Sequence, residues 1–127
     1  MTAAKGLLLL GAFVLAAIGV GFLIAPVQWA AIVEIALPTP TARTDLRATY
    51  GGFDLGFGVF LAVCAFRPAW IRPGLAALGL AAAGFAGGRL LGILAEGTAS
   101  PPMIGFAALE VAIAAGAFVL LRRLPHP

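Results

Sequence analysis

The sequence GLLLLGAFVLAAIGVGFLIA occupies residues 6–25 and contains no charged side chain. A helix needs about 20 mainly apolar residues to cross the roughly 30 Å of hydrocarbon in a bilayer. Pro26 follows this run directly, and a proline in that position is typical of a helix end. We therefore predict that residues 6–25 form a transmembrane helix, which makes the chain an integral membrane protein.

The composition of the 127-residue chain indicates that lipid surrounds most of it. Hydrophobic residues make up 62% of the sequence and charged residues 10%, and the mean hydropathy is +1.09. Soluble domains carry about 25% charged residues, and a chain this short cannot bury so much apolar surface. The formal net charge of +3 comes from few basic residues, most of which flank apolar runs. We expect no nucleic-acid partner, because nucleic-acid binders gather basic side chains on one face.

Three further apolar stretches have the length of a transmembrane helix. They cover residues 47–66, 74–95 and 102–121, and prolines lie at or beside their ends. The sequence thus predicts an all-α, membrane-embedded bundle of four transmembrane helices that forms a single domain over residues 1–127. The segment 28–37 holds one acidic residue among apolar ones. It is compatible with a short helix at the membrane interface or with a loop packed over the bundle.

The placement of arginine and lysine predicts the orientation of the chain. Lys5, the loop with Arg67 and Arg72, and the tail with Arg122 and Arg123 fall on one side of such a bundle. The other side holds an arginine accompanied by three acidic residues. By the positive-inside rule, both the N-terminus and the C-terminus are expected in the cytoplasm.

Metal and cofactor chemistry have no support in the sequence. Cys64 is the only cysteine and His126 the only histidine, so neither an internal disulfide nor a His/Cys metal site is expected. Cys64 is interpreted as a packing residue near a helix end. No Cys-x-x-Cys pair and no Walker-type phosphate loop occurs. We expect no cofactor, no metal ligand and no catalytic residue.

Three ionisable residues, Asp54, Arg89 and Glu110, each lie inside a different apolar stretch. A charge in the bilayer centre costs about 2.5–3.5 kcal/mol on insertion scales, so such residues usually face one another or a wet cavity. Counted from the outer ends of their helices, all three lie at a similar depth of roughly 10–12 Å, given the rise per residue. We therefore expect an ion cluster in which the Arg89 guanidinium bridges the two carboxylates.

Helical spacing adds polar residues to this cluster. Arg47, Tyr50 and Asp54 are separated as i, i+3 and i+7, which places them on one face of a regular α-helix. Arg89 and Glu96 are also seven residues apart on the next apolar stretch. The candidate ligand-binding or polar cluster is therefore Arg47, Tyr50, Asp54, Arg89 and Glu110, with Glu96 as a secondary member.

Three roles are open for these charges. A buried ion pair often fixes helix register without any chemistry. The carboxylates can instead serve a ligand or a proton pathway, and a long side chain can also snorkel to the interface. Small residues recur at every fourth position near the charges and predict close helix packing of the GxxxG type. These rows are Gly84-Gly88-Gly92, Gly52-Gly56 and Ala108-Ala112-Gly116.

The stretch LRATYGGFDLG at residues 46–56, the Gly87-Gly88-Arg89 sequence and Glu110 resemble the bacterial domain of unknown function 4345 family. The resemblance covers nearly the whole chain, with four segments of similar length and an Arg-x-x-Tyr-Gly-Gly signature. It implies a small four-helix integral protein of the bacterial inner (cytoplasmic) membrane, and it implies no activity. The positions that it marks are Arg47, Tyr50, Gly51, Gly52, Asp54, Arg89 and Glu110.

Three functions are compatible with these features. The first is a non-enzymatic protein that binds a small lipid or amphiphile, or that supports a partner. The second is a proton-coupled small multidrug-like transporter acting as a dimer, with Asp54 and Glu110 as proton carriers. The third is a membrane-embedded lipid-modifying enzyme, for which the sequence offers no nucleophile–base pair. We expect the first, with membrane lipids as partners and with a homodimer or a partner membrane protein as its context.

Overall fold

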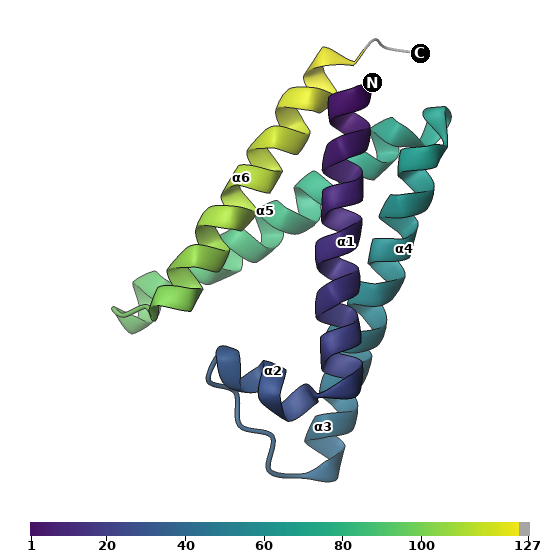
Figure 1. Cartoon of the computed structure of the whole chain (residues 1–127). Helices are drawn as coiled ribbons and strands as arrows, with labels where there is room; N and C mark the ends of the chain where they lie inside the picture. Colours follow the sequence, from purple (N-terminus) through teal and green to yellow (C-terminus); the bar gives the residue numbers. More distant parts are fainter. Residues whose placement is uncertain (125–127) are drawn as a thin grey trace. The chain divides into compact units, whose positions relative to one another are not determined.

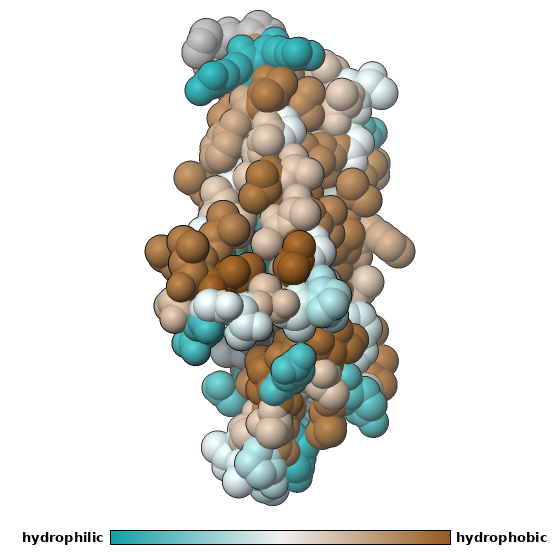
Figure 2. Space-filling view, turned by 90° about the vertical axis from the view of Figure 1, so that its left-hand side faces the viewer, coloured by the Kyte–Doolittle hydropathy of each residue, from teal (hydrophilic) through white to brown (hydrophobic). Residues whose placement is uncertain are grey.

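The computed structural model describes residues 1–124, which are almost entirely helical and contain no strand (Figure 1). Four helical stretches are long and apolar enough to cross a membrane, which indicates a multi-pass membrane protein. The predicted all-α fold with four membrane-spanning helices is therefore confirmed. On the face shown in Figure 2, hydrophobic side chains cover most of the upper part below a small hydrophilic cap. The four stretches are Thr2–Ile24, Pro40–Phe66, Pro68–Glu96 and Pro101–Arg123.

The helices extend further at several ends than the apolar runs predicted. Helix α1 covers Thr2–Ile24, α5 covers Ile71–Glu96 and α6 covers Pro101–Arg123. The second spanning stretch begins already at Pro40, with α3 (Pro40–Leu46) ahead of the predicted start. Hydropathy finds only the part of a helix that lies in hydrocarbon, whereas backbone hydrogen bonds continue into the polar turns at either end.

Local signals set these boundaries. Thr39 is the N-cap of α3, because its hydroxyl accepts a hydrogen bond of 3.1 Å from the backbone N–H of Ala42. Pro40 occupies the first turn that follows, where the missing N–H costs nothing. Gly97 closes α5 with a φ of 68°, a left-handed conformation that suits glycine.

The segment 28–37 contains a helix, but a shorter one that begins earlier than expected. Helix α2 covers Pro26–Ile32, and the chain turns at Glu34, which adopts the left-handed φ of 61°. The indole ring of Trp29 packs against Gly21 of α1, where a side chain of any size would overlap it. Trp29 also lies 6.0 Å from Phe22, measured between ring centroids. Helix α2 therefore folds back onto α1.

The chain divides into two compact units. The first, Leu9–Val63, is called here the α1–α4 unit, after α1 and α4 (Phe53–Phe66). In it the backbones of these two helices approach closely. A Cβ atom at Gly19 would lie 2.6 Å from the backbone nitrogen of Leu55, and one at Gly58 would lie 2.9 Å from the carbonyl oxygen of Ala12. Glycine at positions 19 and 58 is thus required by the packing.

The second unit, Met1–Leu8 with Cys64–Pro127, is called here the α5–α6 unit. Helices α5 and α6 run antiparallel in it, and a Cβ atom at Gly79 would lie 3.2 Å from the Cβ of Ala117. The first residues of α1 and the last of α4 pack at one end of this pair. Leu8, Cys64 and Leu75 are completely buried there.

The predicted rows of small residues are not the close-packing surfaces. A side chain at Gly84, Gly88 or Gly92 would meet no atom within 4 Å, and the same holds for Gly56. On α6 the buried small residues form a different stripe, namely Ala107, Ala114 and Ala117. The GxxxG packing prediction is therefore not confirmed. Spacing by four residues marks one helix face but does not say which face meets a neighbour.

Candidate functional site

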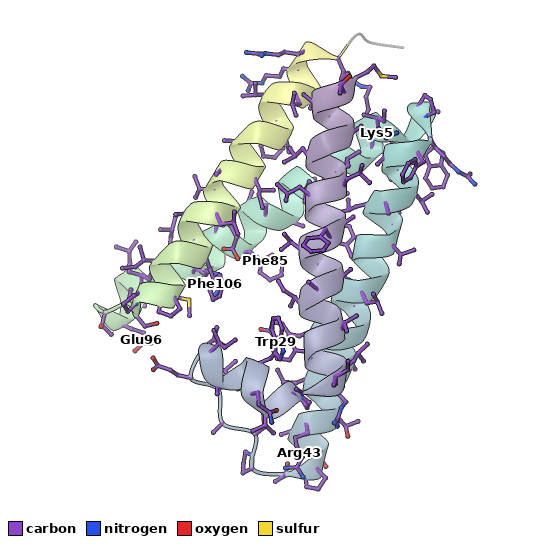
Figure 3. The ribbon with its side chains drawn as sticks, in the orientation of Figure 1. Lys5, Trp29, Arg43, Phe85, Glu96 and Phe106 are labelled. Atoms are coloured by element: carbon purple, nitrogen blue, oxygen red, sulfur yellow. The ribbon has the colours of Figure 1, made fainter. Side chains whose placement is uncertain are left out.

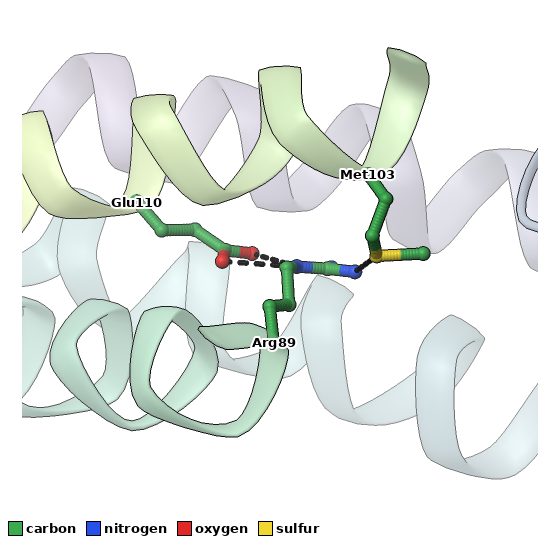
Figure 4. Close-up of polar contacts among 3 residues, drawn as sticks. All are labelled: Arg89, Met103 and Glu110. Carbon is green, nitrogen blue, oxygen red and sulfur yellow. Dashed lines mark hydrogen bonds and ion pairs between the residues drawn. The ribbon is translucent and has the colours of Figure 1, made fainter. Parts of the chain in front are cut away.

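An ion pair joins α5 to α6 in the half of the helix pair that contains the α5 C-terminus. The Nε atom of Arg89 lies 2.9 Å from both carboxylate oxygens of Glu110 (Figure 4). The antiparallel packing of the two helices brings these side chains together. They remain 24% and 16% exposed, so the pair is only partly buried, and a fully buried ion pair is not confirmed.

Two further side chains of α6 complete the surroundings of Arg89. Its Nη1 atom donates a 3.0 Å hydrogen bond to the sulfur of Met103, and its Cζ atom lies 5.3 Å from the centre of the Phe106 ring. Figure 3 shows Phe106 on α6 near the end of the pair marked by Glu96. Sequence reasoning did not find Met103. Counting back from Glu110 by seven and four residues would have found both side chains, since they share one helix face.

The Arg89 guanidinium keeps part of its hydrogen-bonding capacity unused. Nε donates to the Glu110 carboxylate, and one N–H of Nη1 donates to the Met103 thioether, which is a weak acceptor. The second N–H of Nη1 and both N–H groups of Nη2 make no hydrogen bond with the described residues of the α5–α6 unit. The guanidinium and the carboxylate together carry no net charge. The site can therefore donate hydrogen bonds to a ligand without attracting cations or anions through a net charge.

Asp54 lies in the first turn of α4, in the α1–α4 unit. Its side chain is buried, with 6% of the residue exposed, and no hydrogen bond or ion pair joins it to another residue of Leu9–Val63. Arg89 and Glu110 belong to the α5–α6 unit. The structure thus brings two members of the predicted cluster together, and the bridge from Arg89 to Asp54 stays a prediction.

Arg47 and Tyr50 lie in a π-helical segment, η1 (Arg47–Gly52), between α3 and α4. This segment coincides with the Arg-x-x-Tyr-Gly-Gly signature. Arg47 donates from Nε to the carbonyl oxygen of Leu23 at 3.1 Å, and the ring of Tyr50 stacks on Phe22 with centroids 5.0 Å apart. Both are exposed, whereas Asp54 is buried.

The single polar face predicted for Arg47, Tyr50 and Asp54 rested on regular α-helical winding, which does not hold here. In a π-helix the hydrogen bonds run from i to i+5, so each residue turns the chain by a smaller angle. The i, i+3 and i+7 positions no longer align across η1. Arg47 instead serves the last turn of α1, whose final carbonyl groups lack partners inside the helix.

Glu96, the secondary member, is the last residue of α5 and is exposed. It forms no ion pair with the described residues of the α5–α6 unit. Arg89 makes its contacts on the α6 side of the pair, so Glu96 does not extend the ion pair. Among residues 1–124, no group of three or more histidine, cysteine, aspartate or glutamate side chains is placed to hold a metal ion.

Comparison with curated proteins and with solved structures finds no match. A family model, described as a domain of unknown function (DUF4345), matches residues 3–121. The match includes the π-helical segment, Asp54 and the Arg89–Glu110 ion pair. Because it covers nearly the whole chain, the protein belongs to the DUF4345 family.

Proposed function

We propose that this protein is a non-enzymatic membrane protein that binds a small lipid or amphiphile at the Arg89–Glu110 ion pair. The observation that supports the proposal is the unused edge of the guanidinium, where Nη2 has no acceptor among the described residues of the α5–α6 unit. In hydrocarbon an unpaired N–H group is costly, so a ligand that supplies an acceptor oxygen is favoured there.

The charge of the site defines the ligand class. Glu110 already neutralises Arg89, so a ligand with a full negative charge gains little net attraction. An ester carbonyl, an ether or a hydroxyl oxygen accepts from the free N–H groups without upsetting this balance. Phe106 and Met103 offer apolar contact beside the polar group. The proposed ligand is therefore an uncharged or zwitterionic amphiphile with acceptor oxygens at its polar end.

The proposed setting follows from the topology. We place the protein in the bacterial inner membrane with both termini in the cytoplasm, where lipids are its first partners. A second copy or another membrane protein is a further proposed partner. No catalytic step is assigned, because the described residues at the ion pair supply neither a nucleophile with its base nor a metal site.

Lipid binding can be measured by native mass spectrometry of the purified full chain. We expect Arg89→Lys to weaken retention of the bound amphiphile by about 10- to 100-fold, because lysine keeps the charge but loses the planar fork. Arg43→Lys is the matched control and should retain it, because Arg43 is a half-buried arginine of the other unit whose Nη1 donates to the carbonyl oxygen of Leu37. A folded Arg89→Lys protein that binds amphiphile as well as the parent would disprove the proposal and leave the ion pair as a packing element.

A proton-coupled transporter is the second candidate, and the burial of Asp54 favours it. A membrane carboxyl group without a partner in its own unit is suited to gain and lose a proton. Liposomes that hold the purified protein and a pH-sensitive dye test this. Substrate-dependent proton flux that disappears in Asp54→Asn would support transport, and the same low flux in both proteins would exclude it.

A further inference from the structure

One end of the α5–α6 unit gathers basic side chains and contains no aspartate or glutamate. We call it the basic end, and its residues are Lys5, Arg67, Arg72, Arg122 and Arg123. The two acidic residues of the unit lie elsewhere: Glu96 at the far end of α5 and Glu110 near the middle of α6. Both acidic side chains of the unit therefore lie away from the basic end.

These residues come from distant parts of the sequence, but side-chain contacts bring them to one surface of the α5–α6 unit. Arg72, in the first turn of α5, donates from Nη1 to the carbonyl oxygens of Leu121 at 3.3 Å and Leu124 at 2.9 Å. This fixes the start of α5 beside Arg122 and Arg123. The Nζ atom of Lys5 lies 4.6 Å from the centre of the Phe66 ring, which joins the start of α1 to the end of α4. Figure 3 shows Lys5 near the start of α1.

The basic end also has the aromatic residue that is typical of a membrane surface. The Cζ atom of Arg67 lies 5.2 Å from the centre of the Trp70 ring, and Trp70 is 42% exposed. Tryptophan is enriched at headgroup depth, where its ring is apolar and its N–H is polar. Arg67, Arg122 and Arg123 are exposed on the same end, next to the termini of the membrane-spanning helices.

We propose that the basic end binds the phosphate groups of anionic phospholipids. A cluster of basic residues directly beside membrane-spanning helices attracts acidic headgroups of the adjacent leaflet. The guanidinium groups of Arg67, Arg122 and Arg123 present paired N–H donors that match phosphate oxygens. A lipid phosphate lies at the level of Trp70 and is held there by its acyl chains, whereas a free phosphate ion in water is not.

This site is separate from the proposed amphiphile site. Arg122 and Arg123 stand at the C-terminal end of α6, whereas Met103 and Phe106 stand near its beginning. The two sites also differ in charge, since the ion pair is neutral and the basic end is not. Binding at the basic end should weaken with salt, and binding at the ion pair should not.

The test uses the full chain in mild detergent with phosphatidylglycerol and phosphatidylcholine of identical acyl chains. Native mass spectrometry measures how many of each lipid stay bound. At low salt we expect the parent protein to retain about ten times more phosphatidylglycerol than phosphatidylcholine. Most of this preference should be lost at about 0.5 M salt, because that ionic strength screens exposed charges. The double variant Arg122→Gln/Arg123→Gln should lose several-fold of this preference.

Two results would overturn the proposal. One is an equal lipid preference in the parent and in the folded double variant. The other is displacement of the lipid by millimolar inorganic phosphate, which would indicate a site for the free ion. Arg67→Gln, in the exposed loop before α5, provides a second variant if the double variant does not fold. Glu96→Gln, at the opposite end of α5, is the control and should bind as the parent does.

Discussion

The Nε atom of Arg47 lies 3.1 Å from the carbonyl oxygen of Leu23, in the last turn of α1. The other unit repeats this relationship, since Arg72 donates to the carbonyl oxygens of Leu121 and Leu124 at the end of α6. In each unit an arginine near the start of one spanning stretch caps the end of its antiparallel neighbour. A charged donor there also complements the helix dipole.

Arg47→Gln should lower the stability of the protein by about 1 kcal/mol, because the cap is exposed to solvent and its hydrogen bond is lost. Thermal unfolding in detergent, followed by circular dichroism, measures the effect. The melting temperature of Arg47→Lys should fall between those of Arg47→Gln and the parent protein. Arg122→Gln is the matched control, since the side chain of Arg122 forms no hydrogen bond with the described residues of its unit. Equal melting temperatures for Arg47→Gln and the parent would contradict the capping role.

Gly21→Ala should destabilise the protein by about 1–3 kcal/mol, because the new methyl group overlaps the indole ring of Trp29. The control is Gly84→Ala, where nothing lies within 4 Å of the new Cβ atom. Replacing a helical glycine at such an open position is expected to be neutral or to stabilise the helix by up to about 1 kcal/mol. Denaturation in mixed micelles measures both. If Gly21→Ala is also neutral, α2 does not pack on α1 as described.

The ion pair between Arg89 and Glu110 can be tested by a double-mutant cycle. Glu110→Gln leaves the guanidinium without its anion and should cost about 1–3 kcal/mol, since the pair is partly buried. The double variant Glu110→Gln/Arg89→Gln should lose less unfolding free energy than the sum of the losses in the two single variants. Unfolding free energies of the four proteins give the coupling. Strict additivity would show that the two side chains do not interact.

The predicted orientation can be tested with single cysteines in a Cys64→Ser background, because Cys64 is buried and its removal leaves no other thiol. Ala69→Cys, in the loop before α5, should react with a membrane-impermeant maleimide only after the cells are opened. Thr98→Cys, between α5 and α6, should react in intact spheroplasts. The reverse pattern of labelling would place both termini outside.

The number of spanning helices could be predicted because apolar length is a local property that the bilayer thickness fixes. The contact between Arg89 and Glu110 could be predicted from their similar depth in the membrane, since two charged side chains at one level of adjacent helices reach each other. The π-helix at residues 47–52 was not predictable in this way. It depends on how α3 and α4 both fit against α1, and no spacing in the sequence records that fit.

The packing faces were the least predictable feature. The glycines at 84, 88 and 92 have the spacing of a helix contact row, yet a Cβ atom at any of them would meet nothing within 4 Å. Gly19 and Gly21 belong to no such row, yet Leu55 and Trp29 lie directly against them. Backbone approach depends on what the neighbouring helix presents at the same height. For Gly21 that neighbour is a tryptophan from a short helix that hydropathy alone did not delimit.

The π-helical segment also determines where the chain can change its length. A π turn holds one more residue than the α turn it replaces, so a deletion of one residue between 47 and 52 can be absorbed by reverting to α-helical winding. The helix beyond it would then keep its contacts with α1, from Gly58 against Ala12 onward. A deletion of one residue within α4 would instead rotate every later side chain by about 100° relative to α1. Within this spanning stretch, the signature sequence is therefore the region most tolerant of a one-residue deletion.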